Sequence, residues 1–202
     1  MRECLIVGKT HAGKTLFTVN FAHFLGLNTL SVTFRHPNGL VTTKTYSIAA
    51  ARRELVGSVP HMTRALQSIS LDLPVGKGVK RCLFTDTSGL IDHIHADGEI
   101  RRAIAQTLGA IREADLILHL VDTAAVGAKD TPTALGEVDY QVAQFAQMRG
   151  GYAILANKMD LPGAAAGLAK LRLELPGHHI LPVSALYKRG FREVKEFVQR
   201  HL

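Results

Sequence analysis

An eight-residue segment near the start of the chain constrains its fold more than any other feature. Residues 8–15 read GKTHAGKT and directly follow the apolar run CLIV of residues 4–7. This spacing fits the pattern G-x-x-x-x-G-K-[ST], which lies between a strand and a helix. Its glycines let backbone N–H groups point inward at phosphate oxygens, and the positive end of the helix adds to the attraction. The segment therefore predicts a phosphate-binding loop in which Lys14 contacts the β- and γ-phosphates and the hydroxyl of Thr15 ligates Mg²⁺.

The length of the chain and its two cysteines indicate a globular protein of a reducing compartment. With 202 residues, it has room for one domain with a well-developed core, or for one domain with an insertion. No stretch is long and apolar enough to span a bilayer, and no signal-peptide pattern opens the sequence. Cys4 and Cys82 fall in expected buried strands, where free thiols are typical of such a compartment. We therefore expect no transmembrane segment and a cytoplasmic location.

The charge balance of the chain is basic, with a formal net charge of +7. A polyanionic partner such as RNA, or an acidic membrane surface, fits this sign of charge. The basic residues form only short scattered clusters, such as Arg52-Arg53 and Lys188-Arg189. A solvated basic surface without such a partner therefore remains the alternative.

Apolar runs alternate with amphipathic runs along the chain, which is typical of an α/β fold with a mostly parallel sheet. We expect strands at residues 3–7, 66–73, 79–85, 116–121, 151–156 and 179–182. We expect helices at residues 14–26, 98–113, 135–149 and 164–174, and a last helix with the apolar stripe Phe191, Val194, Phe197 and Val198. The second and third strands flank a turn, so they predict an antiparallel hairpin. The expected sheet has six strands, one antiparallel edge strand, and helices on both faces.

Residues 28–58 do not fit this alternation. Two β-like runs flank the turn sequence Pro37-Asn38-Gly39, and a short helix around Ile48 to Leu55 follows. The segment is too small for a core of its own. We therefore expect one domain over residues 1–202, with an insertion at residues 28–58.

A second motif follows the expected strand 79–85, where Asp86-Thr87-Ser88-Gly89 reads D-x-x-G. An aspartate at the end of a strand beside a phosphate loop can hold Mg²⁺ through water, and a glycine lets its N–H approach the γ-phosphate. On its own, Asp86 could equally cap a turn. The motif gains weight from its position, because an open α/β sheet binds ligands at the carboxyl ends of its strands.

Two further motifs follow later strand ends. Asn157-Lys158-Met159-Asp160 reads N-K-x-D after strand 151–156, and Ser184-Ala185-Leu186 follows the last strand. A carboxylate at Asp160 can accept paired hydrogen bonds from N1–H and N2–H of guanine, which adenine cannot donate. The stem of Lys158 can lie along the base, Asn157 can brace the loops, and backbone N–H groups of residues 184–186 can meet O6. An ordinary strand-to-helix loop and a serine N-cap are the alternatives.

Together and in this order, the four motifs resemble those of the Era-like small GTPases of the translation-factor-related class. The resemblance covers residues 2–27 and 60–202. It implies a P-loop G domain that binds GTP and GDP with Mg²⁺, hydrolyses GTP to GDP and phosphate, and switches two loops between states. The nucleotide contacts that it implies are His11, Ala12, Gly13, Lys14, Thr15, Leu16, Asp86, Gly89, Asn157, Lys158, Asp160, Ser184, Ala185 and Leu186.

The family also implies a switch threonine that closes over Mg²⁺ and the γ-phosphate. Thr42, Thr43, Thr45 and Thr63 are candidates, and Thr63 fits best because residues 60–64 read PHMTR. This gives Lys14, Thr63 and Gly89 as catalytic residues, and Thr15, Thr63 and Asp86 as metal ligands. His93 and His95 lie in the expected second switch, where they are either water-positioning groups or parts of a solvated loop.

Two positions depart from the family pattern. Residue 90 is Leu rather than a water-orienting glutamine, so we expect slow intrinsic hydrolysis that waits for a partner. His11 stands where potassium-responsive relatives carry asparagine, which puts potassium activation in doubt.

Three other functional hypotheses remain open at this stage. An ATP-using P-loop protein is the rival enzyme, and Asp160 argues against it. A GTP-gated module with negligible turnover would bind RNA, a ribosome or a membrane, or a protein partner at its switches or at residues 28–58. A degenerate, inactive GTPase is the third, and the intact Lys14, Thr15, Asp86 and Asp160 argue against it.

Overall fold

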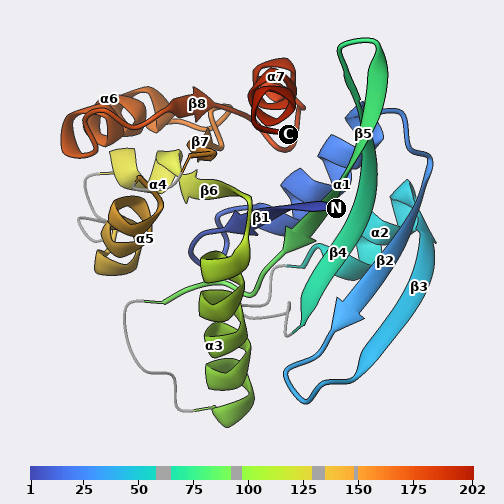
Figure 1. Ribbon diagram of the computed structural model, residues 1–202. Helices are drawn as coiled ribbons and strands as arrows, with labels where there is room; N and C mark the ends of the chain where they lie inside the picture. Colours follow the sequence, from blue (N-terminus) through green and yellow to red (C-terminus); the bar gives the residue numbers. More distant parts are fainter. Residues whose placement is uncertain (58–64, 92–96, 129–134, 148–149) are drawn as a thin grey trace.

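The computed structural model describes residues 1–57, 65–91, 97–128, 135–147 and 150–202 (Figure 1). Its strands are β1 (Arg2–Val7), β2 (Thr29–Arg35), β3 (Val41–Ser47), β4 (Leu66–Val75), β5 (Gly78–Asp86), β6 (Leu116–Asp122), β7 (Tyr152–Asn157) and β8 (Ile180–Pro182). Its helices are α1 (Lys14–Phe24), α2 (Ile48–Leu55), α3 (Gly98–Glu113), α4 (Thr123–Gly127), α5 (Glu137–Gln147), α6 (Ala164–Glu174) and α7 (Phe191–His201).

All the strands belong to one eight-stranded sheet in the order β3-β2-β4-β5-β1-β6-β7-β8. Strands β5, β1, β6, β7 and β8 are parallel, whereas β4, β2 and β3 pair antiparallel at one edge. The expected α/β fold with a mostly parallel sheet is confirmed. The sheet is larger than the six strands expected, because β2 and β3 join its antiparallel edge.

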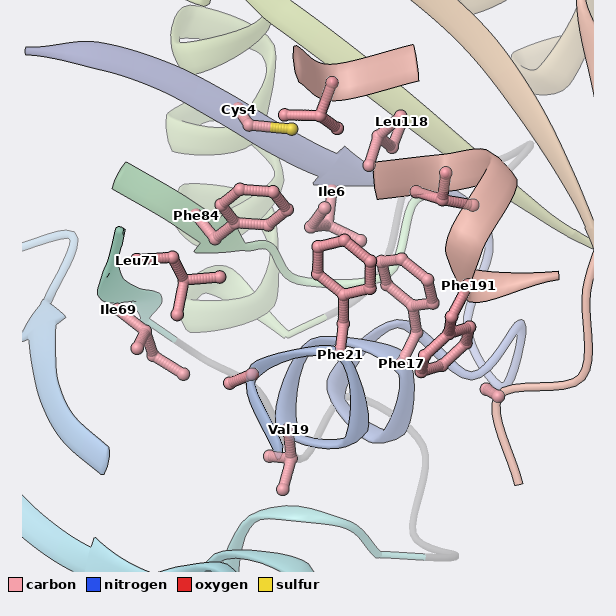
Figure 2. Packing of buried hydrophobic residues seen from close by; sticks show 14 of the residues in the cluster. Cys4, Ile6, Phe17, Val19, Phe21, Ile69, Leu71, Phe84, Leu118 and Phe191 are labelled. Atoms are coloured by element: carbon pink, nitrogen blue, oxygen red, sulfur yellow. The ribbon is translucent and has the colours of Figure 1, made fainter. Parts of the chain in front are cut away.

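Helices cover both faces of the sheet. One core lies between the sheet and α1, α2 and α7, and the other lies between the sheet and α3, α4, α5 and α6. In the first core, the rings of Phe17 and Phe21 stack 5.3 Å apart, and Phe84 and Phe191 pack against them (Figure 2). This packing fixes α1, and therefore the loop that precedes it, against the middle of the sheet. Among the described helices, none has the length and apolarity needed to cross a membrane.

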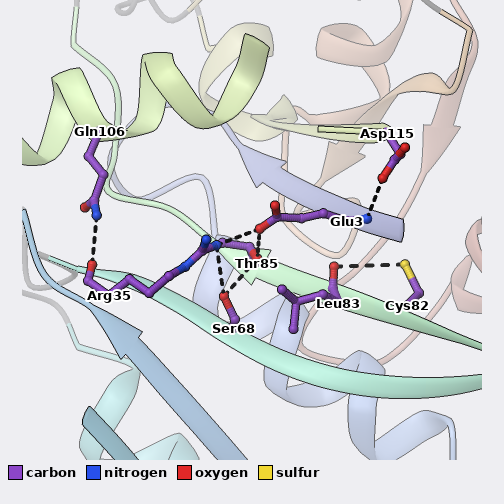
Figure 3. A network of polar contacts seen from close by, with 8 residues as sticks. All are labelled: Glu3, Arg35, Ser68, Cys82, Leu83, Thr85, Gln106 and Asp115. Carbon is purple, nitrogen blue, oxygen red and sulfur yellow. Dashed lines mark hydrogen bonds and ion pairs between the residues drawn. The ribbon is translucent and has the colours of Figure 1, made fainter. Parts of the chain in front are cut away.

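The segment that did not fit the alternation joins the same sheet and the first core. Strand β2 pairs with β4, and Ile48, Ala51 and Leu55 of α2 are buried in the first core. Arg35, at the end of β2, donates from Nη2 to Glu3 Oε1 of β1 at 2.7 Å, and its carbonyl accepts from Gln106 Nε2 of α3 at 3.0 Å (Figure 3). The segment is therefore tied by strand pairing, apolar packing and polar contacts to elements far along the chain.

Candidate functional site

The loop after β1 wraps tightly at the carboxyl edge of the sheet. Gly8 has φ 140°, and a Cβ there would lie 2.2 Å from the carbonyl oxygen of Leu120 in β6. Gly13 has φ 93° and begins α1. Lys14 is 7% exposed, and its ammonium donates to the carbonyl of Lys9 at 2.8 Å. The lysine side chain thus lies back across its own loop.

Thr15 and Asp86 meet beside this loop. The Thr15 hydroxyl donates to Asp86 Oδ2 at 2.5 Å, and Asp86 is 1% exposed. Burial raises the pKa of Asp86 to about 6, although the nearby Lys14 charge opposes the shift. Burial likewise lowers the pKa of Lys14 to about 8, against the opposing effect of Asp86. Both pKa values are shifted in the direction that favours the neutral side chain. These shifts indicate that the two groups have little water around them and too little opposite charge nearby.

The donor set of this corner fits Mg²⁺. Within the described residues, the second carboxylate oxygen of Asp86, Oδ1, is buried and has no hydrogen-bond partner. A buried carboxylate oxygen of this kind is costly unless a cation or another donor approaches it. Carboxylate and hydroxyl oxygens are ligands that Mg²⁺ prefers, together with water and phosphate. Thr15 and Asp86 are therefore brought together as predicted, and they are the residues that could hold the metal.

The D-x-x-G segment lies directly against the phosphate loop. Leu90 N–H donates to the carbonyl of Gly8 at 3.1 Å. A Cβ at Gly89 would lie 2.4 Å from Cγ2 of Thr10 and 2.7 Å from its Cα, so only glycine permits this approach. The expected contact of Gly89 with the γ-phosphate stays a prediction, but its position at the loop is in keeping with it.

Asn157 joins the three segments at the other end of the site. Its Nδ2 donates to the carbonyl of Ala12 at 2.8 Å, and its Oδ1 accepts from the N–H of Ala185 at 2.9 Å. Asn157 is 1% exposed, so both bonds are made in a dry environment where their loss is costly. The Ser184 hydroxyl donates to Asp160 Oδ1 at 2.5 Å and thereby orients that carboxylate. The structure thus brings together loop 8–15, Asn157–Asp160 and residues 184–186.

Asp122 is a residue of this site that the motifs do not identify. Its Oδ2 lies 2.6 Å from Nζ of Lys158, and its Oδ1 accepts from the N–H of Ala125 at the start of α4. Lys158 itself has φ 64°, an uncommon backbone conformation for a residue with a side chain. The ion pair fixes the long stem of Lys158. The signal available in the sequence was an acidic residue at the end of the buried strand β6.

Several expected residues are not placed at this site. Thr63, His93 and His95 lie outside the described residues. The alternatives Thr42, Thr43 and Thr45 lie on β3, and the strands β2, β4 and β5 separate β3 from β1. Because they belong to the outermost strand, the topology does not favour them as metal ligands.

The fold and the site define a nucleotide-binding protein with a phosphate loop and a G-domain sheet. A family described as 50S ribosome-binding GTPase matches residues 42–158, which is more than half of the chain. The protein belongs to this family. The matched residues include the D-x-x-G motif and the first two residues of N-K-x-D.

Curated relatives and solved structures agree with this assignment. GTPase Obg from Akkermansia muciniphila is 26% identical over 162 residues, covering 79% of this chain and 44% of the relative. GTPase Obg from Desulfitobacterium hafniense is 31% identical over 112 residues, covering 54% of this chain and 26% of the relative. The chain thus spans less than half the length of these relatives. An Era variant from Aquifex aeolicus, bound to GDP·AlF4⁻, covers all of this chain and 57% of its own, with a TM-score of 0.67 at 20% identity, a likeness of fold.

Proposed function

We propose that this protein binds GTP and GDP and hydrolyses GTP to GDP and phosphate as a nucleotide-dependent switch. The observation that carries the proposal is the position of Asn157, whose side chain bonds both the phosphate loop and the loop at residues 184–186. One buried residue thereby sets the distance between a phosphate end and a base end. A nucleoside polyphosphate is the ligand class that spans two such ends.

At the base end, we propose that Asp160 accepts hydrogen bonds from N1–H and N2–H of guanine. Its orientation by Ser184 supports this role. Lys158 lies along the base, and the backbone N–H of Leu186 meets O6, since the N–H of Ala185 already donates to Asn157. Adenine carries an acceptor at N1 and an amino group at position 6, so it leaves Asp160 and the N–H group at O6 without their partners.

At the phosphate end, we propose that Lys14 and the backbone N–H groups of residues 11–16 bind the β- and γ-phosphates. Thr15 and Asp86 would hold Mg²⁺, with Thr63 as a third ligand from the proposed first switch, and the ion supplies charge neutralisation at the transferred phosphoryl group. Gly89 N–H donates to a γ-phosphate oxygen. A water molecule attacks in line, and Leu90 has no group that could orient it, so the turnover is slow.

Release of phosphate from GTP tests this proposal. We expect the wild-type protein with Mg²⁺ to turn over on the order of 10⁻⁴–10⁻³ s⁻¹ without a partner. Lys14→Ala removes the ammonium that binds the phosphates, so we expect a loss of at least about 100-fold. His11→Asn is a matched change in the same loop, and a response to potassium in that variant alone would show that His11 prevents potassium activation. Equal turnover of ATP and GTP would contradict the proposal.

We also propose RNA, within a ribosome, as the partner that reads the switch. The formal charge of +7 favours a polyanion. A solved Era structure that contains MgGDPNP and a segment of 16S ribosomal RNA has a TM-score of 0.67 to this chain. We expect binding of RNA that falls steeply with salt and differs between the GTP and GDP states. Salt-independent binding, or binding equal in the two states, would contradict this partner.

A further inference from the structure

Helix α2 contacts the base-binding end of the site through a buried asparagine. Asn20 lies on α1 and is 1% exposed. Its Nδ2 donates to the carbonyl of Ala185 at 2.7 Å, and its Oδ1 accepts from Nε of Arg52 at 2.7 Å. Both ends of the amide are therefore used, one toward the loop at residues 184–186 and one toward α2.

These bonds continue to the phosphate loop. The N–H of Ala185 donates to Asn157, and Asn157 donates to the carbonyl of Ala12. The intermediate residues Asn20, Ala185 and Asn157 are each at most 2% exposed. Hydrogen bonds thus run without interruption from Arg52 to the phosphate loop, and water cannot easily replace a lost member of such a buried chain.

A second contact links α2 to the same loop. Nη2 of Arg52 lies 3.3 Å from Nδ1 of His23, and Nζ of Lys188 lies 2.7 Å from the same nitrogen. Because both neighbours are cationic donors, Nδ1 of His23 must accept. Burial, together with the charges of Lys188 and Arg52, lowers the pKa of His23. Lys188 follows residues 184–186 and has φ 58°. Arg52 therefore contacts Asn20, which bonds Ala185, and His23, which bonds Lys188 two residues beyond that loop.

We propose that Arg52 is a positioning residue that holds the base-binding loop through Asn20 and so sets how long a guanine nucleotide stays bound. The inference rests on the proposed function. It gives a role to residues 28–55, which the proposed phosphate and metal contacts do not include. Arg52 acts through Asn20 and Ala185, because the carbonyl of Ala185 is held by Asn20 and the N–H of Leu186, in the same peptide group, is thereby aimed at O6.

Dissociation of fluorescent GDP tests the role of Arg52. We expect Arg52→Gln to raise the dissociation rate about tenfold, which corresponds to a charge-assisted hydrogen bond. Arg53→Gln is the matched control, since it removes the same charge from the next residue, whose side chain is 75% exposed. We expect that control to stay within about twofold of wild type. Asn20→Ala should raise the rate as well, and its combination with Arg52→Gln should give less than the product of the two effects.

A nucleotide altered at position 6 separates positioning from general loosening. In 6-thio-GDP, sulfur replaces the oxygen that the N–H of Leu186 meets, so the contact that Arg52 supports is already weak. We expect Arg52→Gln to speed the release of 6-thio-GDP by no more than about twofold, because a sulfur acceptor bonds only weakly. Equal acceleration of both nucleotides, or an unchanged GDP rate in Arg52→Gln, would overturn the inference alone. Failure of the wild-type protein to bind GDP would overturn the proposed function and the inference with it.

Discussion

The burial of the Asp86 carboxylate lowers the stability of the ligand-free protein. It is 1% exposed, and burial raises its pKa to about 6, from an ordinary value of 3.8. A carboxyl group whose pKa is higher in the folded state binds its proton more tightly there than in the unfolded chain. The folded protein without a ligand is therefore favoured at low pH, and the benefit is lost as the pH rises through about 6.

Asp86→Asn should stabilise the ligand-free protein and abolish the effect of Mg²⁺ on GDP binding. In EDTA, we expect the free energy of unfolding of the variant and of wild type to be similar below pH 4. Above pH 6, the variant should be more stable by about 3 kcal/mol, since each pKa unit corresponds to about 1.4 kcal/mol. Urea unfolding at several pH values measures this difference. A wild-type protein that is the more stable of the two at pH 7 would contradict the account of Asp86.

At the scale of elements, helices α4 and α6 pack with their backbones in near contact. A Cβ at Gly167 of α6 would lie 1.9 Å from the carbonyl oxygen of Thr123, and one at Gly127 of α4 would lie 2.0 Å from that of Gly163. The N-cap of α4 is Asp122, the partner of Lys158. The close crossing therefore supports the residue that fixes Lys158 at the base end.

Gly167→Ala should force these two helices apart. We expect a loss of about 1–3 kcal/mol in the free energy of unfolding, because the added methyl group has no space. Gly109→Ala is the matched control, since Gly109 lies in α3 and a Cβ there would meet nothing within 4 Å. That change should stabilise the protein by up to about 1 kcal/mol through helix propensity. Similar effects of the two substitutions would show that α4 and α6 do not pack as described.

The sequence predicted long elements well and their long-range pairing poorly. The expected bounds of 98–113 and 164–174 agree with α3 and α6, where apolar spacing, the Asp97 cap and a glycine start define the helices. Helix α4 was missed because five residues are too few to show a helical period. Strands β2 and β3 were expected only as β-like runs, since pairing of β2 with β4 depends on contacts across more than 30 residues.

The same contrast holds for the candidate site. Local motifs placed Thr15 and Asp86 at one expected Mg²⁺ site and predicted the bracing by Asn157, because each motif follows a strand of one parallel sheet. The direct hydrogen bond between Thr15 and Asp86 was not expected. Asn20 and Arg52 carry no motif. Their role depends on where α2 packs, and the sequence offered for it only the polar Asn20 between the apolar residues Val19 and Phe21 of α1.

At the scale of the whole molecule, residues 28–55 are held to distant parts of the sheet. Arg35 pairs with Glu3 of β1 across the sheet, and the side chains are 38% and 23% exposed. Figure 3 shows that this pair also contacts Ser68 and Thr85 on the two strands between them. A partly buried pair with several partners contributes more than an exposed one.

Arg35→Met should lower the free energy of unfolding by about 1–2 kcal/mol, within a single transition. Arg81→Met is the control, because Arg81 and Asp72 form an exposed pair on the same sheet, with side chains 65% and 52% exposed. We expect its effect to be below about 0.5 kcal/mol. Urea unfolding followed by circular dichroism measures both. A separate early transition in Arg35→Met would mean that residues 28–55 unfold on their own, contrary to a single domain.

Competition among nucleotides for the wild-type protein and for Asp160→Asn tests the central claim most directly. With Mg²⁺ present, wild type should bind GTP and GDP at least about 100-fold more tightly than ATP, because adenine leaves polar groups of the site unpaired. The amide of Asp160→Asn offers a donor where the carboxylate accepts, so the variant should lose guanine nucleotides and gain xanthosine diphosphate. Equal binding of ATP by wild type, or an unchanged preference in the variant, would contradict a guanine nucleotide site.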